Sequence, residues 1–429
     1  MKNRFFGGFW AGLASAFILF TLAGALYFGA MEDRQAKAET LTEQLAKANG
    51  DTAEQQLLEE KTFQSKLNTL RTIIDLYFWK DVDNETLYEG IYRGLLSSLD
   101  DPYSRYYTAE EYQEEIESIE GSYCGIGALV NQNMSTMIMT IVRPFVDGPA
   151  YKAGILPGDI IYMVDGVDVT GEELSQVVKK MKGEKGTKVT LTVVREGVDE
   201  PIEVVITRDV IEVETVTYEM LANNIGYIYI MEFDEITLRQ FEQAVDELEE
   251  AGMQGLVVDI RDNGGGLLDT VCKMLDRIIP TGNIVYTMDK YGNREDINAT
   301  SKESLDIPIA VLVNGNSASA SEIFAGALQD YELATIVGTQ SFGKGIVQSI
   351  VPLSDGSAVK VTVSTYYTPD GRCIHGEGIT PDVVVELADE LKQQVIIEKE
   401  DDNQLKAAIK VIKNQIKENE IKEKLKKLK

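Results

Sequence analysis

The feature that most constrains this chain is an uninterrupted apolar stretch close to its start. Residues 5–31 contain no charged side chain, and a stretch of this length can cross a bilayer as a helix. Basic residues precede it and acidic residues follow it. The positive-inside rule therefore predicts a single-pass anchor in the cell membrane, with a cytoplasmic N-terminus and an extracytoplasmic remainder. The alternative is a signal peptide cleaved near residues 36–38, but the apolar core of a signal peptide is shorter, at about 7–15 residues.

Charge and residue usage exclude several classes of function. The chain has 41 Lys and Arg against 70 Asp and Glu, a formal net charge of −29, whereas a nucleic-acid-binding protein needs a basic surface. His375 is the only histidine, so a metal site that requires two or more histidine ligands is excluded. The three cysteines are far apart and form no CxxC pair, which argues against a disulfide framework or a zinc cluster. We therefore expect no nucleic-acid partner and no metal.

At 429 residues, the chain is long enough for about two or three domains. The predicted fold class is a multidomain α/β protein, because strand-like and helical segments alternate in the second half of the chain. The segments differ in composition and in the period of their apolar residues. The predicted segments are a transmembrane anchor at 5–31, a polar stalk at 32–60, a helical region at 61–118, a β-rich domain at 119–208, a mixed α/β core at 209–390 and an amphipathic, Lys-rich helix at 391–429.

The β-rich domain carries a distinctive glycine pattern. Residues 147–166 read DGPAYKAGILPGDIIYMVDG, and Gly125, Ile126, Gly127 and Ala128 precede them. The longer run resembles a PDZ domain, and the four earlier residues resemble the carboxylate-binding loop of that domain. Glycines free the loop backbone, so its N–H groups can hold a C-terminal carboxylate while the bound peptide adds as a strand. The glycines alone would fit ordinary turns, but the loop and the AGxxPGD motif together favour a PDZ domain.

A group of serines follows a strand-like segment of the α/β core. Residues 309–313 form an apolar run, and the segment NSASASEIFAGALQD after it has apolar residues at helical spacing. Ser319 is therefore expected where a strand meets a helix, a position at which backbone N–H groups and the helix dipole stabilise an oxyanion. Ser319 and Glu322 also fit the S-x-x-E capping box, and the local sequence by itself favours this structural interpretation.

A glycine-flanked lysine follows at Lys344, in the segment TIVGTQSFGKGIVQ. The spacing of Gly338, Gly343 and Lys344 nearly matches a phosphate-binding loop. Gly345 replaces the required hydroxyl, however, and a β-rich run follows in place of a helix, so we do not expect nucleotide binding. A desolvated lysine can act as a general base, Ser-Lys pairs occur in serine hydrolases, and Gln348 on the same strand face could orient the amine. A solvated turn lysine is the alternative that spacing leaves open.

These segments together resemble the carboxyl-terminal processing (tail-specific) peptidases of the S41 type. The resemblance covers about residues 65–388 and rests on SASASEIFAGALQD, GTQSFGKGIVQ, DIRDNGGGLL and the run at 367–382, in the order of that family. It implies that Ser319 is the nucleophile, that Lys344 is the general base and that Gln348 supports the lysine.

The resemblance also implies an oxyanion hole of two backbone N–H groups. One comes from Ala320 and the other from a glycine of the DNGGG run, taken here as Gly265. The family often has proline where this chain has Gly264, so the choice of glycine stays open. His375 falls in a segment that is structural in the family, and we expect it to be packed or hydrogen-bonded.

The sequence thus predicts a membrane-anchored, extracytoplasmic serine endopeptidase without a cofactor. Its PDZ domain is expected to capture the C-terminal tails of protein or peptide substrates. The competing interpretation is a non-catalytic, membrane-bound PDZ adaptor on a hydrolase-like core. The helix expected at 391–429 could pack on a partner subunit, lie near anionic lipid or stay solvated, so a homodimer is left open.

Overall fold

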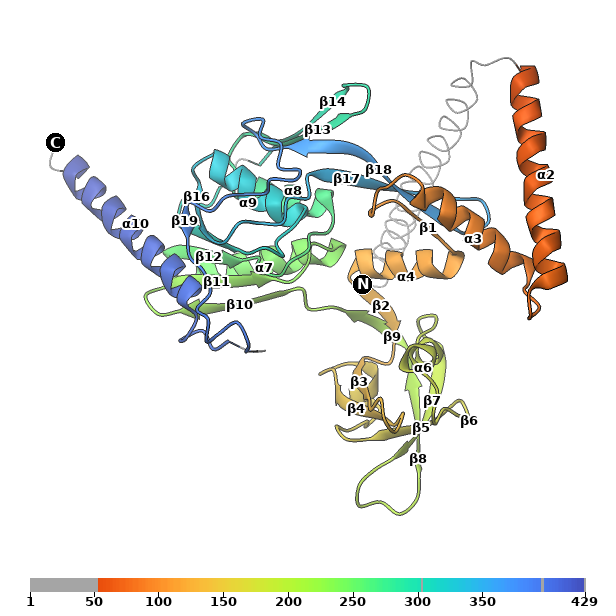
Figure 1. Cartoon of the computed structure of the whole chain (residues 1–429). Helices are drawn as coiled ribbons and strands as arrows, with labels where there is room; N and C mark the ends of the chain where they lie inside the picture. Colours follow the sequence, from red (N-terminus) through yellow and green to blue (C-terminus); the bar gives the residue numbers. More distant parts are fainter. Residues whose placement is uncertain (1–52, 302–303, 395–396, 428–429) are drawn as a thin grey trace, which may run out of the picture. The chain divides into compact units, whose positions relative to one another are not determined.

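The computed structural model describes residues 53–301, 304–394 and 397–427 (Figure 1). The anchor expected at 5–31 and most of the expected stalk lie outside these residues. Among the helices that are described, none combines the length and the apolar character needed to cross a bilayer. The chain separates into two compact units, Met1–Asp100 and Asp101–Lys429.

The described part of the first unit is a pair of helices, α2 (Ala53–Tyr77) and α3 (Asn84–Ser97). The start of α3 is capped, because the Asp83 side chain accepts the backbone N–H of Thr86 at 2.8 Å. Such a cap satisfies one of the donors that a helix leaves open at its N-terminus. The part of the predicted helical region (61–118) that lies in this unit is therefore formed by two helices.

The second unit begins with a short strand and a helix that lead into the β-rich domain. They are β1 (Arg105–Tyr107) and α4 (Ala109–Glu120). A capping box starts α4, since the Thr108 side chain accepts the N–H of Glu111 and the Glu111 carboxylate accepts the N–H of Thr108. Gly121 ends α4 with φ +65°, a left-handed conformation that glycine adopts without steric cost.

The β-rich domain is an antiparallel sheet in the order β3-β4-β5-β7-β8, with β6 beside β5. Its apolar side chains form a separate buried cluster that includes Ile141, Leu191 and Ile206. A ribbon of β2 and β9 joins this domain to α4 and to the core. The elements are β2 (Ser122–Gly125), β3 (Ala128–Gln132), β4 (Met139–Pro144), α5 (Pro149–Lys152), β5 (Ile160–Val164), β6 (Val167–Asp168), α6 (Leu174–Met181), β7 (Lys188–Val194), β8 (Ile202–Thr207) and β9 (Asp209–Glu212).

A six-stranded sheet in the order β10-β11-β12-β15-β16-β19 forms the centre of the α/β core. Its strands from β11 to β19 pair in parallel. Helices α7, α8 and α9 cover one face, and α10 covers the other (Figure 1). The elements are β10 (Val216–Leu221), β11 (Ile225–Ile230), α7 (Glu235–Glu250), β12 (Gly255–Asp259), α8 (Leu268–Asp276), β15 (Ile309–Val313), α9 (Ala320–Asp330), β16 (Ala334–Gly338), β19 (Val383–Val384) and α10 (Asn403–Lys427).

Strand β12 shows why both faces of this sheet are covered. All of its residues are buried. Leu256 and Val258 join the cluster under α7, α8 and α9, whereas Val257 joins the cluster under α10. A parallel strand buried on both faces has this continuous apolar character, so the sheet lies between two helical layers.

Helix α10 differs from the expectation for the Lys-rich tail. Leu405, Ala408 and Ile412 are buried against the sheet of their own chain. Gly255 makes room for the helix, because a Cβ at this position would lie 2.3 Å from Cγ2 of Ile412. The first half of α10 is therefore part of the core, and none of the three predicted environments, a partner subunit, lipid or solvent, describes it.

A second sheet is antiparallel and carries the lysine segment. Strand β18 pairs with β1, β13 and β17. The hairpin of β17 and β18 begins at Ile346, two residues after Lys344, so this sheet determines where the lysine lies. The strands besides β1 are β13 (Gly282–Asp289), β14 (Arg294–Ala299), β17 (Ile346–Pro352) and β18 (Ala358–Tyr367).

Candidate active site

Ser319 occupies a strained turn between β15 and α9. Its backbone has φ +57° and ψ −113°, a region that residues with a side chain rarely adopt and that persists only where the surroundings enforce it. The preceding loop is fixed, because the Ser317 hydroxyl donates to the carbonyl of Ile260 at 2.8 Å and the N–H of Ala318 donates to the carbonyl of Asn263 at 3.0 Å. The turn thus presents a half-buried serine at the start of a helix.

The buried carboxylate of Glu322 joins the serine turn to the lysine loop. Its Oε2 accepts the backbone N–H of Ser319 at 2.9 Å and that of Lys344 at 2.8 Å. Its Oε1 accepts the Ser341 hydroxyl at 2.6 Å and the N–H of Gly343 at 2.7 Å. Glu322 therefore makes the capping contact that the local sequence favours. The same carboxylate also fixes the lysine loop, a role that the sequence did not indicate.

Lys344 lies two residues before the start of β17, and its amine is partly withdrawn from solvent. Its Nζ lies 4.5 Å from the centre of the Tyr103 ring. Burial is the main cause that lowers the pKa of Lys344, and the positive charge of Lys360 acts in the same direction. The carboxylates of Asp101 and Glu322 oppose this shift of the pKa. A lowered pKa increases the neutral fraction of the amine, which is the form that a general base requires.

A buried tyrosine connects the backbones of the two predicted catalytic residues. The Tyr366 hydroxyl lies 2.9 Å from the carbonyl oxygen of Ser319 and 2.6 Å from that of Lys344. Burial raises the pKa of Tyr366 well above its usual value, so the hydroxyl keeps its proton and can donate. This contact fixes the serine turn and the lysine loop independently of Glu322.

Ser319, Lys344 and Gln348 line one cavity of about 340 Å³. They come from the α9 turn, from the loop before β17 and from β17 itself. The side-chain amide of Gln348 donates to Oγ1 of Thr362 on β18 at 3.3 Å. The structure therefore brings the three predicted side chains to the same space.

The two predicted oxyanion donors, Ala320 and Gly265, line the same cavity. The N–H of Ala320 has no acceptor among the described residues, as is usual for the first residue of a helix. Gly265 has φ +111°, and a Cβ there would lie 2.8 Å from the Ala318 carbonyl oxygen and from the Ser319 Cβ. Its N–H donates to Oδ1 of Asn263 at 2.8 Å, so this donor already has an acceptor in the structure.

The glycine loop is held by residues that the sequence did not indicate. Asn263 is buried, and its side-chain amide donates to the carbonyl of Ile230 at 3.0 Å. Gly264 and Gly266 line the cavity beside Gly265, so the choice of oxyanion glycine stays open. The asparagine in the DNGGG run is the only sequence signal that could have indicated this anchoring.

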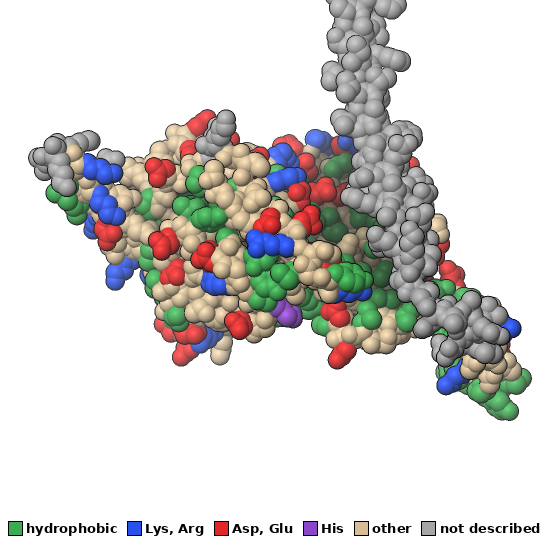
Figure 2. Space-filling model, turned by 90° about the horizontal axis from the view of Figure 1, so that it is seen from above, with side chains coloured by type: hydrophobic (Ala, Val, Ile, Leu, Met, Phe, Trp, Pro, Cys, Tyr) green, Lys and Arg blue, Asp and Glu red, His purple; other side chains and the backbone are tan. Residues whose placement is uncertain are grey.

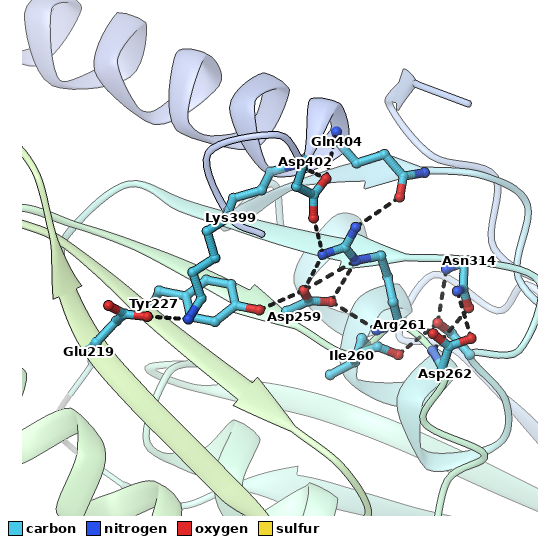
Figure 3. A network of polar contacts seen from close by, with 12 residues as sticks. Glu219, Tyr227, Asp259, Ile260, Arg261, Asp262, Asn314, Lys399, Asp402 and Gln404 are labelled. Carbon is cyan, nitrogen blue, oxygen red and sulfur yellow. Dashed lines mark hydrogen bonds and ion pairs between the residues drawn. The ribbon is translucent and has the colours of Figure 1, made fainter. Parts of the chain in front are cut away.

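Arg261, two residues before Asn263, anchors the same loop to the start of α10. It forms ion pairs with Asp259 at 2.5 Å and with Asp402 at 2.7 Å (Figure 3). Its Nη1 also donates to Oε1 of Gln404 at 2.9 Å. The C-terminal segment is therefore fastened to the strand end from which the glycine loop departs.

His375 lies outside this cavity. It is exposed (Figure 2, purple), and its Nδ1 accepts the N–H of Gly345 at 3.4 Å. The histidine is thus hydrogen-bonded, as the sequence predicts, but it is not packed. The loop before Gly345 leads into strand β17, so the helix N-terminus that a phosphate-binding loop needs does not follow it.

The predicted carboxylate-binding loop, residues 125–128, connects β2 to β3. Gly127 has φ +69°, and a Cβ there would lie 2.8 Å from Cδ1 of Ile211, so glycine alone fits without strain. Ile126 is buried, and its carbonyl accepts the N–H of Ala150 at 2.7 Å. Strand β3 lies at the edge of its sheet, where open backbone groups can pair with an added strand.

Three regions of the chain match known protein families. Residues 224–385 match peptidase family S41, and residues 141–195 match the PDZ domain. Residues 19–111 match the N-terminal domain of the activating protease CtpB.

The chain is also similar over most of its length to individual proteins. It is 42% identical over 312 residues to a carboxy-terminal-processing protease of Bartonella bacilliformis, covering 71% of this chain and 70% of that protein. It is 40% identical over 328 residues to the carboxy-terminal processing protease CtpA of Bacillus subtilis, covering 76% and 70%. A solved structure of a photosystem II D1 C-terminal processing protease has 31% identity and a TM-score of 0.45, covering 74% of this chain and 86% of that one.

Proposed function

The chain belongs to peptidase family S41 and is a C-terminal processing serine protease with a PDZ domain, and from this premise we propose that it cleaves peptide bonds by a Ser-Lys mechanism. The observation that supports this mechanism is the shared cavity of Ser319, Lys344 and Gln348. The lowered pKa of Lys344, caused mainly by burial, supports the role of its amine as the base.

In the proposed mechanism, neutral Lys344 takes the proton of the Ser319 hydroxyl as its oxygen attacks the peptide carbonyl. The carbonyl oxygen becomes an oxyanion, which the open N–H of Ala320 can bind. Gly265 can supply a second donor only if its N–H gives up its hydrogen bond to Asn263 or donates to Asn263 and the oxyanion together. The lysine then protonates the departing amine, an acyl-enzyme remains, and water activated by Lys344 hydrolyses it. Gln348 supports the amine from β17.

We further propose that the PDZ domain holds the C-terminal tail of the substrate. The edge strand β3 and the glycine loop that precedes it support this role. A peptide that pairs with β3 would direct its terminal carboxylate to the N–H groups of residues 125–128. Such tethering raises the effective concentration of the rest of the substrate near the peptidase core.

The uncharged stretch at residues 5–31 supports the proposal that the enzyme is anchored in a membrane with its catalytic part outside the cytoplasm. Full-length protein should remain in the membrane pellet after alkaline carbonate extraction, whereas a chain that starts near Gln35 should be soluble. Quantitative release of the intact full-length chain by high salt would contradict an integral anchor.

Peptidase activity is tested with an unstructured protein substrate that has a free C-terminus. Wild type should produce fragments detectable by mass spectrometry, and Ser319→Ala should produce none while still binding C-terminal peptides. If folded wild-type protein binds such peptides but cleaves no substrate, the non-catalytic adaptor is the better description.

A further inference from the structure

A second lysine faces the space that holds the proposed catalytic groups. Lys360, on β18, lines the same cavity as Ser319 and Lys344. Its Nζ lies 2.7 Å from Oε1 of Glu115, a residue of α4 that lines this cavity as well. Lys344, Lys360 and Glu115 also line an adjoining cavity of about 240 Å³. The ion pair of Lys360 and Glu115 therefore lies beside the proposed general base.

This ion pair is partly withdrawn from solvent. The side chains of Lys360 and Glu115 are 28% and 19% exposed, so water and salt screen their charges less than at an open surface. Arg105 lies 3.5 Å from the other carboxylate oxygen of Glu115, but its side chain is 60% exposed. Lys360 is thus the closer and less exposed cation beside Glu115. Its position is fixed in the sheet, where it pairs with Ile350 on one side and with Arg105 on the other.

We propose that Lys360 is a positioning residue whose positive charge keeps the amine of Lys344 neutral, and that Glu115 limits how much of this charge Lys344 experiences. The inference rests on the proposed role of Lys344 as general base. Lys360 itself is not required to touch the substrate or to transfer a proton.

The charges that face Lys344 come from several elements. Asp101, before β1, and Glu322, in α9, favour the protonated amine, while Lys360 opposes it and is the largest contribution to the lowered pKa of Lys344 after burial. Glu232 and Asp234 line the cavity from the segment before α7. Among the groups that influence the pKa of Lys344, Lys360 is therefore the one whose charge favours the neutral base.

The two members of the ion pair should then have opposite effects on the pH dependence of catalysis. Without the charge of Lys360, the pKa of Lys344 rises, so Lys360→Gln should move the rising limb of kcat/KM to higher pH, by on the order of one unit. At neutral pH this corresponds to about a tenfold loss of activity. Without the charge of Glu115, Lys360 acts uncompensated, so Glu115→Gln should move the same limb to lower pH.

The experiment measures kcat/KM between pH 6 and pH 10 for the full-length protein in detergent, with a peptide substrate. Lys360→Arg should keep the wild-type profile because it keeps the charge, and Lys360→Met, which retains an apolar stem, should shift it as Lys360→Gln does. Lys290→Gln, at an exposed position beside β13, is the matched control and should shift nothing. Thermal unfolding establishes that each variant is folded.

Two outcomes separate this inference from the proposed function. If Lys344→Ala keeps its activity, the base is another group and the proposed mechanism fails. If Lys344→Ala is inactive but the charge-removing variants of Lys360 and Glu115 leave the pH midpoint unchanged, or shift it in the same direction, the Ser-Lys mechanism stands and the electrostatic role of Lys360 is wrong. A lower kcat without a shifted midpoint would mean that Lys360 has a purely structural role.

Discussion

The carboxylate of Glu322 accepts the backbone N–H of Lys344 at 2.8 Å, which fastens the loop of the proposed base to the helix that begins after the proposed nucleophile. Glu322 is fully buried, and its two oxygens accept four hydrogen bonds. The position of Lys344 relative to Ser319 therefore depends on a side chain that takes no part in the proposed chemistry.

We expect Glu322→Gln to lower peptidase activity by about a hundredfold, since small displacements of catalytic groups have effects of this size. Glutamine keeps the shape of the side chain. Its NH₂ group, however, cannot accept the hydrogen bonds that one oxygen of the carboxylate accepts. Each buried donor left without an acceptor costs about 1–3 kcal/mol, so the melting temperature should fall as well. Hydrolysis and thermal unfolding measure the two effects, with the exposed Glu250→Gln as control. Near-normal hydrolysis by Glu322→Gln would mean that the other contacts of the loop, among them those of Tyr366 and Phe342, are sufficient to position it.

Asp402→Ala should destabilise the core because it removes one partner of the largely buried Arg261. The ion pair with Asp259 remains, so we expect a loss of about 1–3 kcal/mol, below the roughly 3–5 kcal/mol found when a buried charge loses its only partner. Urea unfolding measures the change. The exposed neighbour Asp401 supplies the matched control, Asp401→Ala. Equal stability of the two variants would mean that the α10 anchor contributes nothing.

The contacts of Glu322 show which parts of the site the sequence predicts and which it does not. The local pattern indicates β15, the helix after Ser319 and the strand after Lys344, because each depends on the period and composition of neighbouring residues. The Glu322 contact with Ser319 follows from the capping motif. Its contacts with residues 341–344 depend on how two distant segments meet, which no local pattern contains.

The environment predicted for the C-terminal helix was wrong for the same reason, because it depends on contacts between distant segments. The apolar residues of the tail predict an amphipathic helix, but its period does not say what the apolar face covers. That face packs where Gly255 leaves room, and Asp402 pairs with Arg261 from far away in the sequence. The partnership of Glu115 and Lys360 likewise joins α4 to β18 across the intervening PDZ domain. Such contacts become visible only in three dimensions.

Asp234→Asn should stabilise the protein above neutral pH and have little effect near pH 4. Burial, with the charge of Glu232, raises the pKa of Asp234 from its usual value of 3.8 to about 7. In the unfolded chain this carboxyl loses its proton near pH 4, whereas the folded protein retains it until about pH 7. Stability therefore falls as pH rises through this interval. Asparagine keeps a good helix cap and cannot ionise.

Melting temperatures of wild type and Asp234→Asn at pH 4 and pH 8 measure this difference. Glu242→Gln, at an exposed position on α7, is the control. A stabilisation of equal size at both pH values would show that the effect does not come from ionisation of Asp234.

The PDZ domain should bind peptides that end in a free carboxylate after small or apolar residues. Amidating the C-terminus should weaken binding about tenfold or more, because charge-assisted hydrogen bonds contribute roughly 1.5–3 kcal/mol. Gly127→Ala should weaken it too, since its Cβ would lie 2.8 Å from Cδ1 of Ile211 and 3.2 Å from Cδ of the Pro149 ring. Gly197→Ala also places alanine at positive φ but meets open space, so it is the control. Calorimetry measures the affinities, and equal binding of acid and amide would contradict carboxylate recognition.

Lys344→Ala and Lys344→Arg should both abolish peptide hydrolysis while peptide binding by the PDZ domain persists. Guanidinium stays protonated and cannot accept the proton of Ser319, so conserving the charge does not conserve the base. His375→Asn should retain activity if it folds, because the imidazole is exposed and lies outside the cavity. Wild-type kcat/KM should rise with pH as the amine of Lys344 loses its proton, and the midpoint should lie below the usual lysine pKa because burial lowers it. A folded Lys344→Arg enzyme with near-normal turnover, together with an inactive His375→Asn, would assign the base to histidine and overturn the Ser-Lys mechanism.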